Sequence, residues 1–314
     1  MPIPTYPEIQ VAHNRIKPFI HQTPVVTSES LNNITGCNLY FKCENFQKVG
    51  AFKYRGATNA LQTLPISKIQ NGVATHSSGN HAQALSLAAK VRGIKAYIVM
   101  PKNSKKVKVN AVKGYGGDII FCEPTLQSRE ETLEKVVNET GATFIHPYHN
   151  FNVICGQGTA AIEFINEVNN LDIIIAPVGG GGLLSGTAIT VKNLKPKINV
   201  IAAEPKNADD AYRSFYSKKL VPSLNPTTIA DGLLTSLGEL NFNIILKYVD
   251  DIITIKEESI IKAMKLIWER MKIIVEPSSA VTLAVVLENL NRFKSQNVGL
   301  ILSGGNVDLE NLPF

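Results

Sequence analysis

The sequence has few cysteines, and they are not arranged as zinc ligands or as a disulfide framework. Its four cysteines, Cys37, Cys43, Cys122 and Cys155, lack a Cys-x-x-Cys spacing and have no accompanying histidine cluster. This pattern is typical of a protein in a reducing compartment. We therefore expect a fold that depends neither on structural zinc nor on disulfide bonds.

Long apolar runs and blocks of one charge are also missing. No run approaches the roughly 18 apolar residues of a membrane span, and residues 1–6 lack the pattern of a secretion signal. The net charge is +6, but the 32 basic residues are spread among 26 acidic ones without interleaved aromatics. The densest basic cluster, within 102–113, is either a solvated helix face or an anion-attracting surface. We expect a cytoplasmic protein that binds neither a membrane nor a nucleic acid.

What the 314 residues do contain is a regular alternation of strand and helix patterns. Apolar runs such as Asp172 to Ala176 are typical of parallel strands that are covered on both faces. The alternation predicts an α/β fold with two parallel-sheet αβα domains. The predicted strands are 38–44, 73–76, 96–100, 118–122, 143–146, 172–178, 199–203, 251–255 and 298–302. The predicted helices are 7–20, 52–64, 80–92, 104–113, 128–140, 156–168, 183–194, 256–271 and one after Pro277, with a less regular stretch at 218–243.

The order of these elements also predicts the domains. The strand at 38–44 needs a sheet to join, so residues 1–66 are expected to pack with residues 150–314 in a large domain. Residues 67–149 would form a small inserted domain. The cleft between two such domains is a common place for a ligand site.

Lys53 is the candidate reacting group. It lies between Phe52 and Tyr54 at the start of a predicted helix, shortly after Gly50. Enclosure by the two rings and the charge of Arg55 would both lower the pKa of its amine, by desolvation and by repulsion. A neutral amine can react with a carbonyl group. The alternative is an ordinary lysine on a solvated helix face.

Turns rich in glycine follow three of the predicted strands. Gly179–Gly182 would offer backbone N–H groups at the start of a helix, which predicts a phosphate site. Its spacing matches neither a dinucleotide fingerprint nor a P-loop, although Glu204 lies roughly where a ribose-binding acid would, about 20 residues on. The turn His76–His81 carries donors that suit a carboxylate, although they would also serve for ordinary helix capping. Ser303–Asn306 taken alone is typical of a turn.

Together these features resemble the fold-type II pyridoxal-phosphate enzymes, which have a tryptophan synthase β-like fold. Within them the chain resembles the serine racemases and the threonine and serine dehydratases. The similarity extends from about His21 to Leu309. The matching segments are 73–81, 155–159, 203–210, 229–232, 268–272 and 275–277.

The resemblance implies a role for each matching residue. Pyridoxal 5′-phosphate would be bound covalently by Lys53 and contacted by Phe52, Asn80, Gly179, Gly180, Gly181, Gly182 and Ser303. Ser78 would face Lys53 across the cofactor as a second catalytic group. The substrate would be contacted by Ser77, Ser78, Asn80, His81, Arg129 and Ser236. A divalent cation, Mg²⁺ or alternatively Ca²⁺ or Mn²⁺, would bind Glu204, the Ala208 carbonyl and Asp210. That role displaces the ribose-binding interpretation of Glu204.

The implied activity is racemisation of L-serine together with β-elimination of L-serine to pyruvate and ammonia. The resemblance further implies a homodimer, stimulation by Mg²⁺, and ATP as a candidate allosteric effector. The alternative is an ammonia-lyase acting on L-threonine, L-serine or L-threo-3-hydroxyaspartate with little racemase activity. Val49–Ala51 replaces the Thr-Gly-Ser of mammalian serine racemases, so nucleotide activation and substrate preference stay open. A nucleotide-dependent oxidoreductase and a non-catalytic binding module are the alternatives from other classes.

Overall fold

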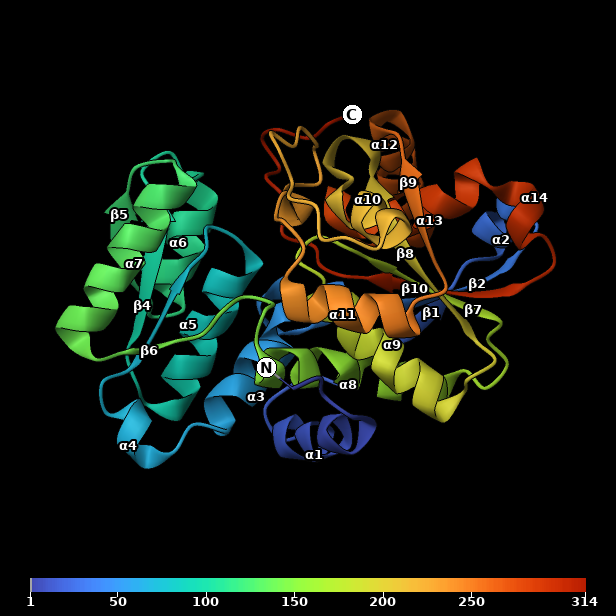
Figure 1. The fold of residues 1–314 in the computed structure, drawn as a ribbon. Coiled ribbons are helices and arrows are strands. Elements are labelled where there is room, and N and C mark those ends of the chain that lie inside the picture. The colour runs from blue at the N-terminus through green and yellow to red at the C-terminus, as the bar shows by residue number, and fades with distance from the viewer. Residues whose placement is uncertain (1) are drawn as a thin grey trace.

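The computed structural model describes residues 2–314 and contains two β-sheets that are each packed between helices (Figure 1). The larger sheet has six strands in the order β1-β2-β10-β7-β8-β9, and all neighbours are parallel except the edge pair β1 and β2. Its strands are β1 (Val25–Thr27), β2 (Asn38–Cys43), β7 (Ile173–Pro177), β8 (Asn199–Pro205), β9 (Asp251–Ile255) and β10 (Asn297–Leu302).

The strands of this sheet are buried on both faces. In β7, Ile173 and Ile175 belong to one apolar cluster and Ile174 to the cluster on the opposite face. This arrangement explains why the strand reads as a continuous isoleucine run. One face is covered by α8 (Phe151–Glu167), α9 (Gly182–Leu194), α10 (Asp210–Ser217) and α11 (Glu239–Tyr248), and the other by α2 (Glu29–Thr35), α12 (Glu257–Leu266), α13 (Pro277–Glu288) and α14 (Leu290–Phe293). Helix α1 (Tyr6–Ile16) packs outside α8.

The smaller sheet has four parallel strands in the order β5-β4-β3-β6. They are β3 (Val73–His76), β4 (Ala96–Pro101), β5 (Asp118–Cys122) and β6 (Thr143–Phe144), accompanied by α4 (Ile66–Ile69), α5 (Asn80–Arg92), α6 (Lys106–Gly114) and α7 (Leu126–Thr140). Helix α3 (Lys53–Gln62) packs against α5 of this unit and against α8 of the larger one. The predicted α/β class with two parallel sheets is confirmed, whereas the domain boundaries stay a proposal.

Glycines allow α3, α8 and α9 to approach one another closely. A Cβ atom at Gly156 in α8 would lie 2.6 Å from the carbonyl oxygen of Arg55 in α3. A Cβ atom at Gly186 in α9 would lie 2.5 Å from the backbone nitrogen of Gly158 in α8. The three helices therefore form one closely packed group. Lys53 begins one of these helices, and the glycine loop precedes another, α9.

Several elements differ from the prediction. Helix α8 begins at Phe151 rather than 156, because the Asn150 side chain accepts a hydrogen bond from the backbone N–H of Val153 at 3.0 Å and caps the helix there. The irregular stretch includes the start of α11 at Glu239, and α2, α10 and α14 were not predicted. The helix predicted over 256–271 is α-helical only to Leu266 and continues as a π-helical turn to Met271. Such turns insert one residue into the ladder of backbone hydrogen bonds.

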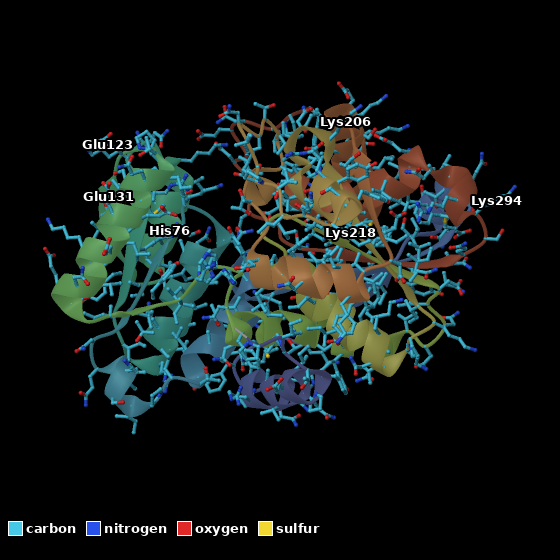
Figure 2. All side chains as sticks on the ribbon, in the orientation of Figure 1. His76, Glu123, Glu131, Lys206, Lys218 and Lys294 are labelled. Atoms are coloured by element: carbon cyan, nitrogen blue, oxygen red, sulfur yellow. The ribbon has the colours of Figure 1, made fainter. Side chains whose placement is uncertain are left out.

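The surface carries charges of both signs over both units. Figure 2 shows Glu123 and Glu131 on the smaller unit, and Lys206, Lys218 and Lys294 on the larger one; all five residues are exposed. Among residues 2–314, no helix combines the length and the apolar character that crossing a membrane requires.

Candidate active site

Lys53 lies at the first position of α3, where the two units meet. The loop before it contains two residues with positive φ, Val49 at 58° and Gly50 at 66°. Its partly buried Nζ donates a hydrogen bond to the carbonyl oxygen of Pro147 at 3.0 Å. The same nitrogen lies 5.2 Å from the ring centroid of Phe52 and 5.9 Å from that of Tyr148. Aromatic rings therefore replace much of the water that would surround an exposed amine.

This environment changes the protonation of the amine. Burial lowers the pKa of Lys53 to about 8, and the carboxyl group of Glu276 acts in the opposite direction. The predicted desolvation is confirmed. A substantial fraction of the amine is thus neutral close to physiological pH.

Two parts of the sequence prediction for Lys53 are wrong. Its second aromatic neighbour is Tyr148, because Tyr54 is fully buried elsewhere, with its ring 5.8 Å from Lys48 Nζ. Arg55 does not contribute to the lowered pKa, because its guanidinium is paired with two buried carboxylates, those of Glu44 and Glu163.

The glycine loop Gly179–Gly182 connects β7 to α9 and has no room for side chains. A Cβ atom at Gly180 would lie 2.3 Å from the ring of Tyr148. At Gly181, where φ is 88°, it would lie 2.7 Å from Leu237. The loop therefore presents only backbone groups at the positive end of a helix, which is the chemistry of a phosphate cradle. Because Tyr148 contacts this loop and also lies beside Lys53, the candidate phosphate cradle and the Lys53 amine belong to one site.

The turn Ser77–Asn80 connects β3 to α5 and contacts residues of the larger unit. The Asn80 amide nitrogen donates to Glu276 Oε1 at 2.8 Å, and its oxygen accepts from the Asn306 amide at 2.9 Å. Ser77 Oγ accepts from the backbone N–H of Gly79 at 3.3 Å, and Ser78 is partly buried. These contacts join the smaller unit to the loop that follows β10.

His81 follows this turn and is buried. Its Nε2 lies 3.2 Å from the carbonyl oxygen of Ile145, and its Nδ1 has no partner within the part of the chain that the structure describes. Burial, followed by the charge of Lys53, lowers the pKa of His81 far below its usual value. The ring is therefore neutral at physiological pH.

Ser303 lies directly after β10 and is buried. Its Oγ is 3.1 Å from the hydroxyl of Ser279, and its carbonyl oxygen accepts from the backbone N–H of Phe52 at 3.0 Å. A buried hydroxyl at this position could pair with a ring nitrogen without carrying a charge.

Glu276 is a site residue that the sequence prediction did not assign. It is 4% exposed, and burial raises the pKa of its carboxyl group to about 8. The segment Val275–Pro277 resembles the family, and an acid directly before a helix-starting proline was the available signal. Because Glu276 contacts Asn80 and influences Lys53, it belongs to the same site.

The segment His146–His149 was also missed. The Nδ1 atom of His146 accepts hydrogen bonds from the backbone N–H groups of His149 at 3.0 Å and Tyr148 at 3.3 Å. Burial lowers the pKa of His146 to about 3, so this acceptor is neutral. The bonds fix the turn that presents Pro147 to Lys53. Its position after β6, at the carboxyl edge of a parallel sheet, was the available signal.

Two predicted substrate contacts lie apart from this group. Arg129 in α7 is partly buried and donates from Nε to the carbonyl oxygen of Thr125 at 3.4 Å. Ser236 is exposed, and its Oγ accepts from the backbone N–H of Ser223 at 3.2 Å. Within residues 2–314, neither side chain forms a hydrogen bond with the residues around Lys53.

The predicted cation ligands are clustered near the end of β8. Glu204 accepts from the backbone N–H groups of Ala211 at 2.9 Å and Tyr212 at 2.7 Å. Asp210 Oδ2 accepts from the backbone N–H of Leu237 at 2.8 Å, and its buried Oδ1 has no partner among the described residues. Burial and then the charge of Asp210 raise the pKa of Glu204 well above its usual value, and burial raises that of Asp210 to about 6.

This chemistry fits a hard cation, because two buried carboxylates repel each other and one oxygen has a free lone pair. Over residues 2–314, no group of three or more His, Cys, Asp or Glu side chains is placed to hold a metal. The predicted set has two carboxylates and the carbonyl of Ala208, so water would complete its coordination.

Comparison with known proteins places the chain among enzymes that depend on pyridoxal phosphate. A family model described as "Pyridoxal-phosphate dependent enzyme" matches residues 16–304. The chain is 52% identical over 314 residues to a β-hydroxyaspartate dehydratase of Paracoccus denitrificans, covering 100% of both chains. It is also 52% identical over 309 residues to a serine racemase of Arabidopsis thaliana, covering 97% of this chain and 93% of that protein. The solved serine racemase of Dictyostelium discoideum superposes with a TM-score of 0.93 at 52% identity, covering 97% and 99% of the two chains.

Proposed function

The chain belongs to the family of pyridoxal-phosphate-dependent enzymes, and we propose that it racemises L-serine and also eliminates water from L-serine, giving pyruvate and ammonia. The observation that carries this proposal is the position of the Lys53 amine. It lies between the rings of Phe52 and Tyr148, with a pKa of about 8, and the Tyr148 ring also packs on the glycine loop. The equal identity to a dehydratase and to racemases supports an enzyme with both activities.

The residues of the site fit pyridoxal 5′-phosphate. Lys53 would hold it covalently, the glycine loop its phosphate, Asn80 its 3′-oxygen and Ser303 its pyridine nitrogen, with Phe52 beside the ring. When bound, the cofactor supplies an electron sink for the electron pair left on the substrate α-carbon. A serine hydroxyl does not keep a pyridine nitrogen protonated, which favours rapid β-elimination over transamination.

Two groups of the chain would move the α-proton. The neutral amine of Lys53 would take it from one face, and the hydroxyl of Ser78 would return a proton to the other face, which gives the opposite enantiomer. Loss of the β-hydroxyl before that return gives elimination. The packing of α3 against α5 supports this assignment, since Lys53 begins α3 and Ser78 lies just before α5.

The substrate carboxylate would be bound by the Ser77–His81 turn. Ser77 and Asn80 offer a hydroxyl and an amide, and His81 follows at the same helix start. We propose that residues 67–149 close over the substrate as a small domain, which would bring Arg129 toward it from α7. Ser236 would approach from the larger domain, next to the segment that packs on the glycine loop.

We also propose that Mg²⁺ binds Glu204, the Ala208 carbonyl and Asp210 and stimulates the enzyme. Asp210 accepts a hydrogen bond from the backbone N–H of Leu237 at 2.8 Å. The Leu237 side chain packs on Gly181, where a Cβ atom would lie 2.7 Å from it. A cation that fixes Asp210 would therefore stabilise the segment packed on the phosphate cradle. Asp210→Ala is expected to reduce activation by Mg²⁺, and an unchanged metal response would contradict this role.

A homodimer and activation by ATP complete the proposal. Lys105 and Lys108 reach from the smaller unit to Asp308, at 3.8 Å, and to Asp231 of the larger one. All four line a cavity of about 240 Å³, where a polyphosphate could compete for the lysines. Analytical ultracentrifugation tests the dimer, and initial rates with and without ATP test the activation.

Ser78→Ala tests the two-base mechanism. Formation of D-serine is expected to be lost while production of pyruvate from L-serine continues, because only the second proton donor is removed. D-serine formation at the wild-type rate would refute the role of Ser78. The control variant, Lys53→Ala, should lose both reactions.

The second candidate is a dehydratase with little racemase activity, and the similarity to the β-hydroxyaspartate dehydratase supports it. The two candidates are distinguished by supplying L-serine, D-serine, L-threonine and L-threo-3-hydroxyaspartate with and without Mg²⁺. The oxo-acid and the enantiomer formed from each are measured. Oxo-acid from hydroxyaspartate without D-serine from L-serine would favour the dehydratase.

A further inference from the structure

A cavity of about 650 Å³ lies outside the proposed active site, between α1, the segment 17–24 and the end of α8. Its volume is within the range of small-molecule sites, roughly 300–1,000 Å³. The residues that matter for its chemistry are His13, Lys17, Gln22, Thr23, Glu163 and Glu167. None of them has a role in the proposed reaction.

The rim of this cavity carries one charge of each sign. Lys17 and Glu167 are both exposed, and neither forms an ion pair within residues 2–314. Among residues 2–314, Glu167 accepts a hydrogen bond only from the backbone N–H of Val25, at 3.3 Å. Side-chain amides of Gln22 and Asn166 also line the cavity. A ligand with one ammonium and one carboxylate group would pair both charges, whereas a singly charged ligand would leave one unpaired.

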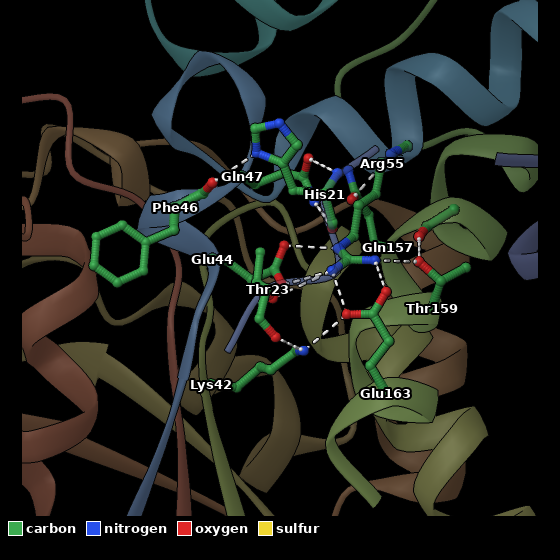
Figure 3. Close-up of polar contacts among 12 residues, drawn as sticks. His21, Thr23, Lys42, Glu44, Phe46, Gln47, Arg55, Gln157, Thr159 and Glu163 are labelled. Carbon is green, nitrogen blue, oxygen red and sulfur yellow. Dashed lines mark hydrogen bonds and ion pairs between the residues drawn. The ribbon is translucent and has the colours of Figure 1, made fainter. Parts of the chain in front are cut away.

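The floor of the cavity is a buried, charge-balanced network (Figure 3). The carboxylate of Glu163 accepts from Lys42 Nζ and from both terminal nitrogens of Arg55, each at 2.7 Å. Arg55 also binds Glu44, whose Oε1 accepts from the hydroxyl of Thr23 at 2.6 Å. Two cations thus balance two anions, and Glu163 has no free charge to offer a ligand. The floor instead connects the cavity to Arg55, two residues after Lys53 in α3.

A second connection to Lys53 runs through His21, which lies between the lining residues Ile20 and Gln22. The backbone N–H of His21 donates to Gln47 Oε1 at 3.0 Å, and Gln47 Nε2 donates to the carbonyl oxygen of His21 at 2.7 Å (Figure 3). Gln47 precedes the 3₁₀ turn Lys48–Gly50, which leads directly to Lys53.

We propose that this cavity is an effector site for a free amino acid or another small zwitterion. Ligand binding there would alter the position and surroundings of the Lys53 amine through Gln47 and Arg55. The ligand carboxylate would pair with Lys17 and its ammonium with Glu167. A ligand that bridges the two would fix the segment 17–24 against α8. Because binding and its effect are reciprocal, a change at Lys53 would in turn change the affinity of the cavity.

The binding test uses the cofactor-loaded enzyme after borohydride reduction, so that an amino acid can no longer react at Lys53. Calorimetric titration with glycine is expected to show one site per chain. Lys17→Gln and Glu167→Gln should each weaken binding by roughly twofold to fivefold, as expected for losing a charged contact at an exposed rim. The matched controls Lys195→Gln and Glu258→Gln remove exposed charges elsewhere and should leave binding unchanged. Absence of binding, or binding unaffected by both rim variants, would overturn the site.

Titrations with acetate and with methylamine test the ligand class. Each carries one of the two charges and should bind roughly twofold to fivefold more weakly than glycine. Equal binding of either one would refute a zwitterion site.

The connection to Lys53 is tested by the fluorescence of the reduced cofactor. Glycine should change this fluorescence in the wild-type protein. In Gln47→Met it should bind with similar affinity but produce a smaller change. An unchanged wild-type signal, or an equal change in the variant, would refute the connection.

Discussion

Replacing Arg55 by methionine tests how strongly the buried network holds α3, the helix that begins with Lys53. Arg55 is 0% exposed. It donates to Glu44 at 2.7 and 2.9 Å, to Glu163 at 2.7 Å through two nitrogens, and to the hydroxyls of Thr159 and Thr23 at 3.2 and 3.3 Å. Methionine keeps an apolar side chain of similar length but makes none of these bonds.

The magnitude follows from the charges that remain. Without Arg55, Glu44 keeps only the Thr23 hydroxyl among its side-chain partners, and Glu163 keeps only Lys42. Removing one partner of a buried ion pair costs about 3–5 kcal/mol. The entropy of unfolding, about 2.1 cal/mol/K per residue, amounts to roughly 0.66 kcal/mol/K if all 314 residues unfold together. The melting temperature should therefore fall by roughly 5–8 °C.

Differential scanning calorimetry measures this change, and Arg213→Met is the control. Arg213 forms an ion pair with Asp209 in which the two side chains are 39% and 35% exposed. Such surface pairs contribute about 0–1 kcal/mol, so the control should lose less than roughly 2 °C. The double variant Arg55→Met/Glu44→Gln should recover part of the loss, because one unpaired charge disappears. An Arg55→Met variant as stable as the control would refute the reasoning.

Three further predictions concern the pH dependence of the network and two glycines. Burial raises the pKa of Glu163, but the contacts with Arg55 and Lys42 outweigh it and lower the pKa below its ordinary 4.5. The stabilisation of the fold by ionised Glu163 is therefore present above pH 4.5 and is lost as the pH falls through the pKa of the folded state. Urea midpoints should accordingly fall more steeply below about pH 4.5 in the wild type than in Glu163→Gln. Gly180→Ala would place a Cβ atom 2.3 Å from the Tyr148 ring and should weaken cofactor binding roughly tenfold or more, measured by the visible absorbance during titration. Gly186→Ala would place one 2.5 Å from the Gly158 nitrogen and should cost about 1–3 kcal/mol in urea unfolding, and wild-type stability in that variant would contradict the close packing of α8 and α9.

Local sequence patterns predicted those features that depend on neighbours in the chain. The isoleucine run at 173–175 predicted a strand buried on both faces, because successive side chains of a strand point to opposite faces and all three are apolar. Gly179–Gly182 predicted a cradle, because four glycines between a strand and a helix leave the backbone N–H groups uncovered by side chains. Lys53 was predicted as the reacting group because aromatic residues flank it in the sequence. Its pKa is lowered as expected, and desolvation alone is the cause.

The partners of these residues could not be predicted in the same way. The second ring at Lys53 comes from Tyr148, which is carried by the segment after β6 rather than by the neighbouring chain. The guanidinium of Arg55 pairs with Glu163, 108 residues away, so its charge is neutralised by a contact that adjacent sequence does not encode. Repulsion between neighbouring cations was therefore a reasonable inference from sequence that the tertiary structure cancels.

The residues around Lys53 come from both units, so the burial of this proposed catalytic amine depends on how far the site is closed. Pro147 and Tyr148 follow the last strand of the smaller sheet, whereas Glu276 precedes α13 on the larger one. Any movement of the smaller unit relative to the larger one therefore changes how far the amine is buried. Since burial lowers the pKa of Lys53, a more closed site would hold more of the neutral amine. More of Lys53 would thus be neutral, and so able to accept a proton, when a substrate is enclosed and water is excluded, whereas the open site would keep more of it protonated.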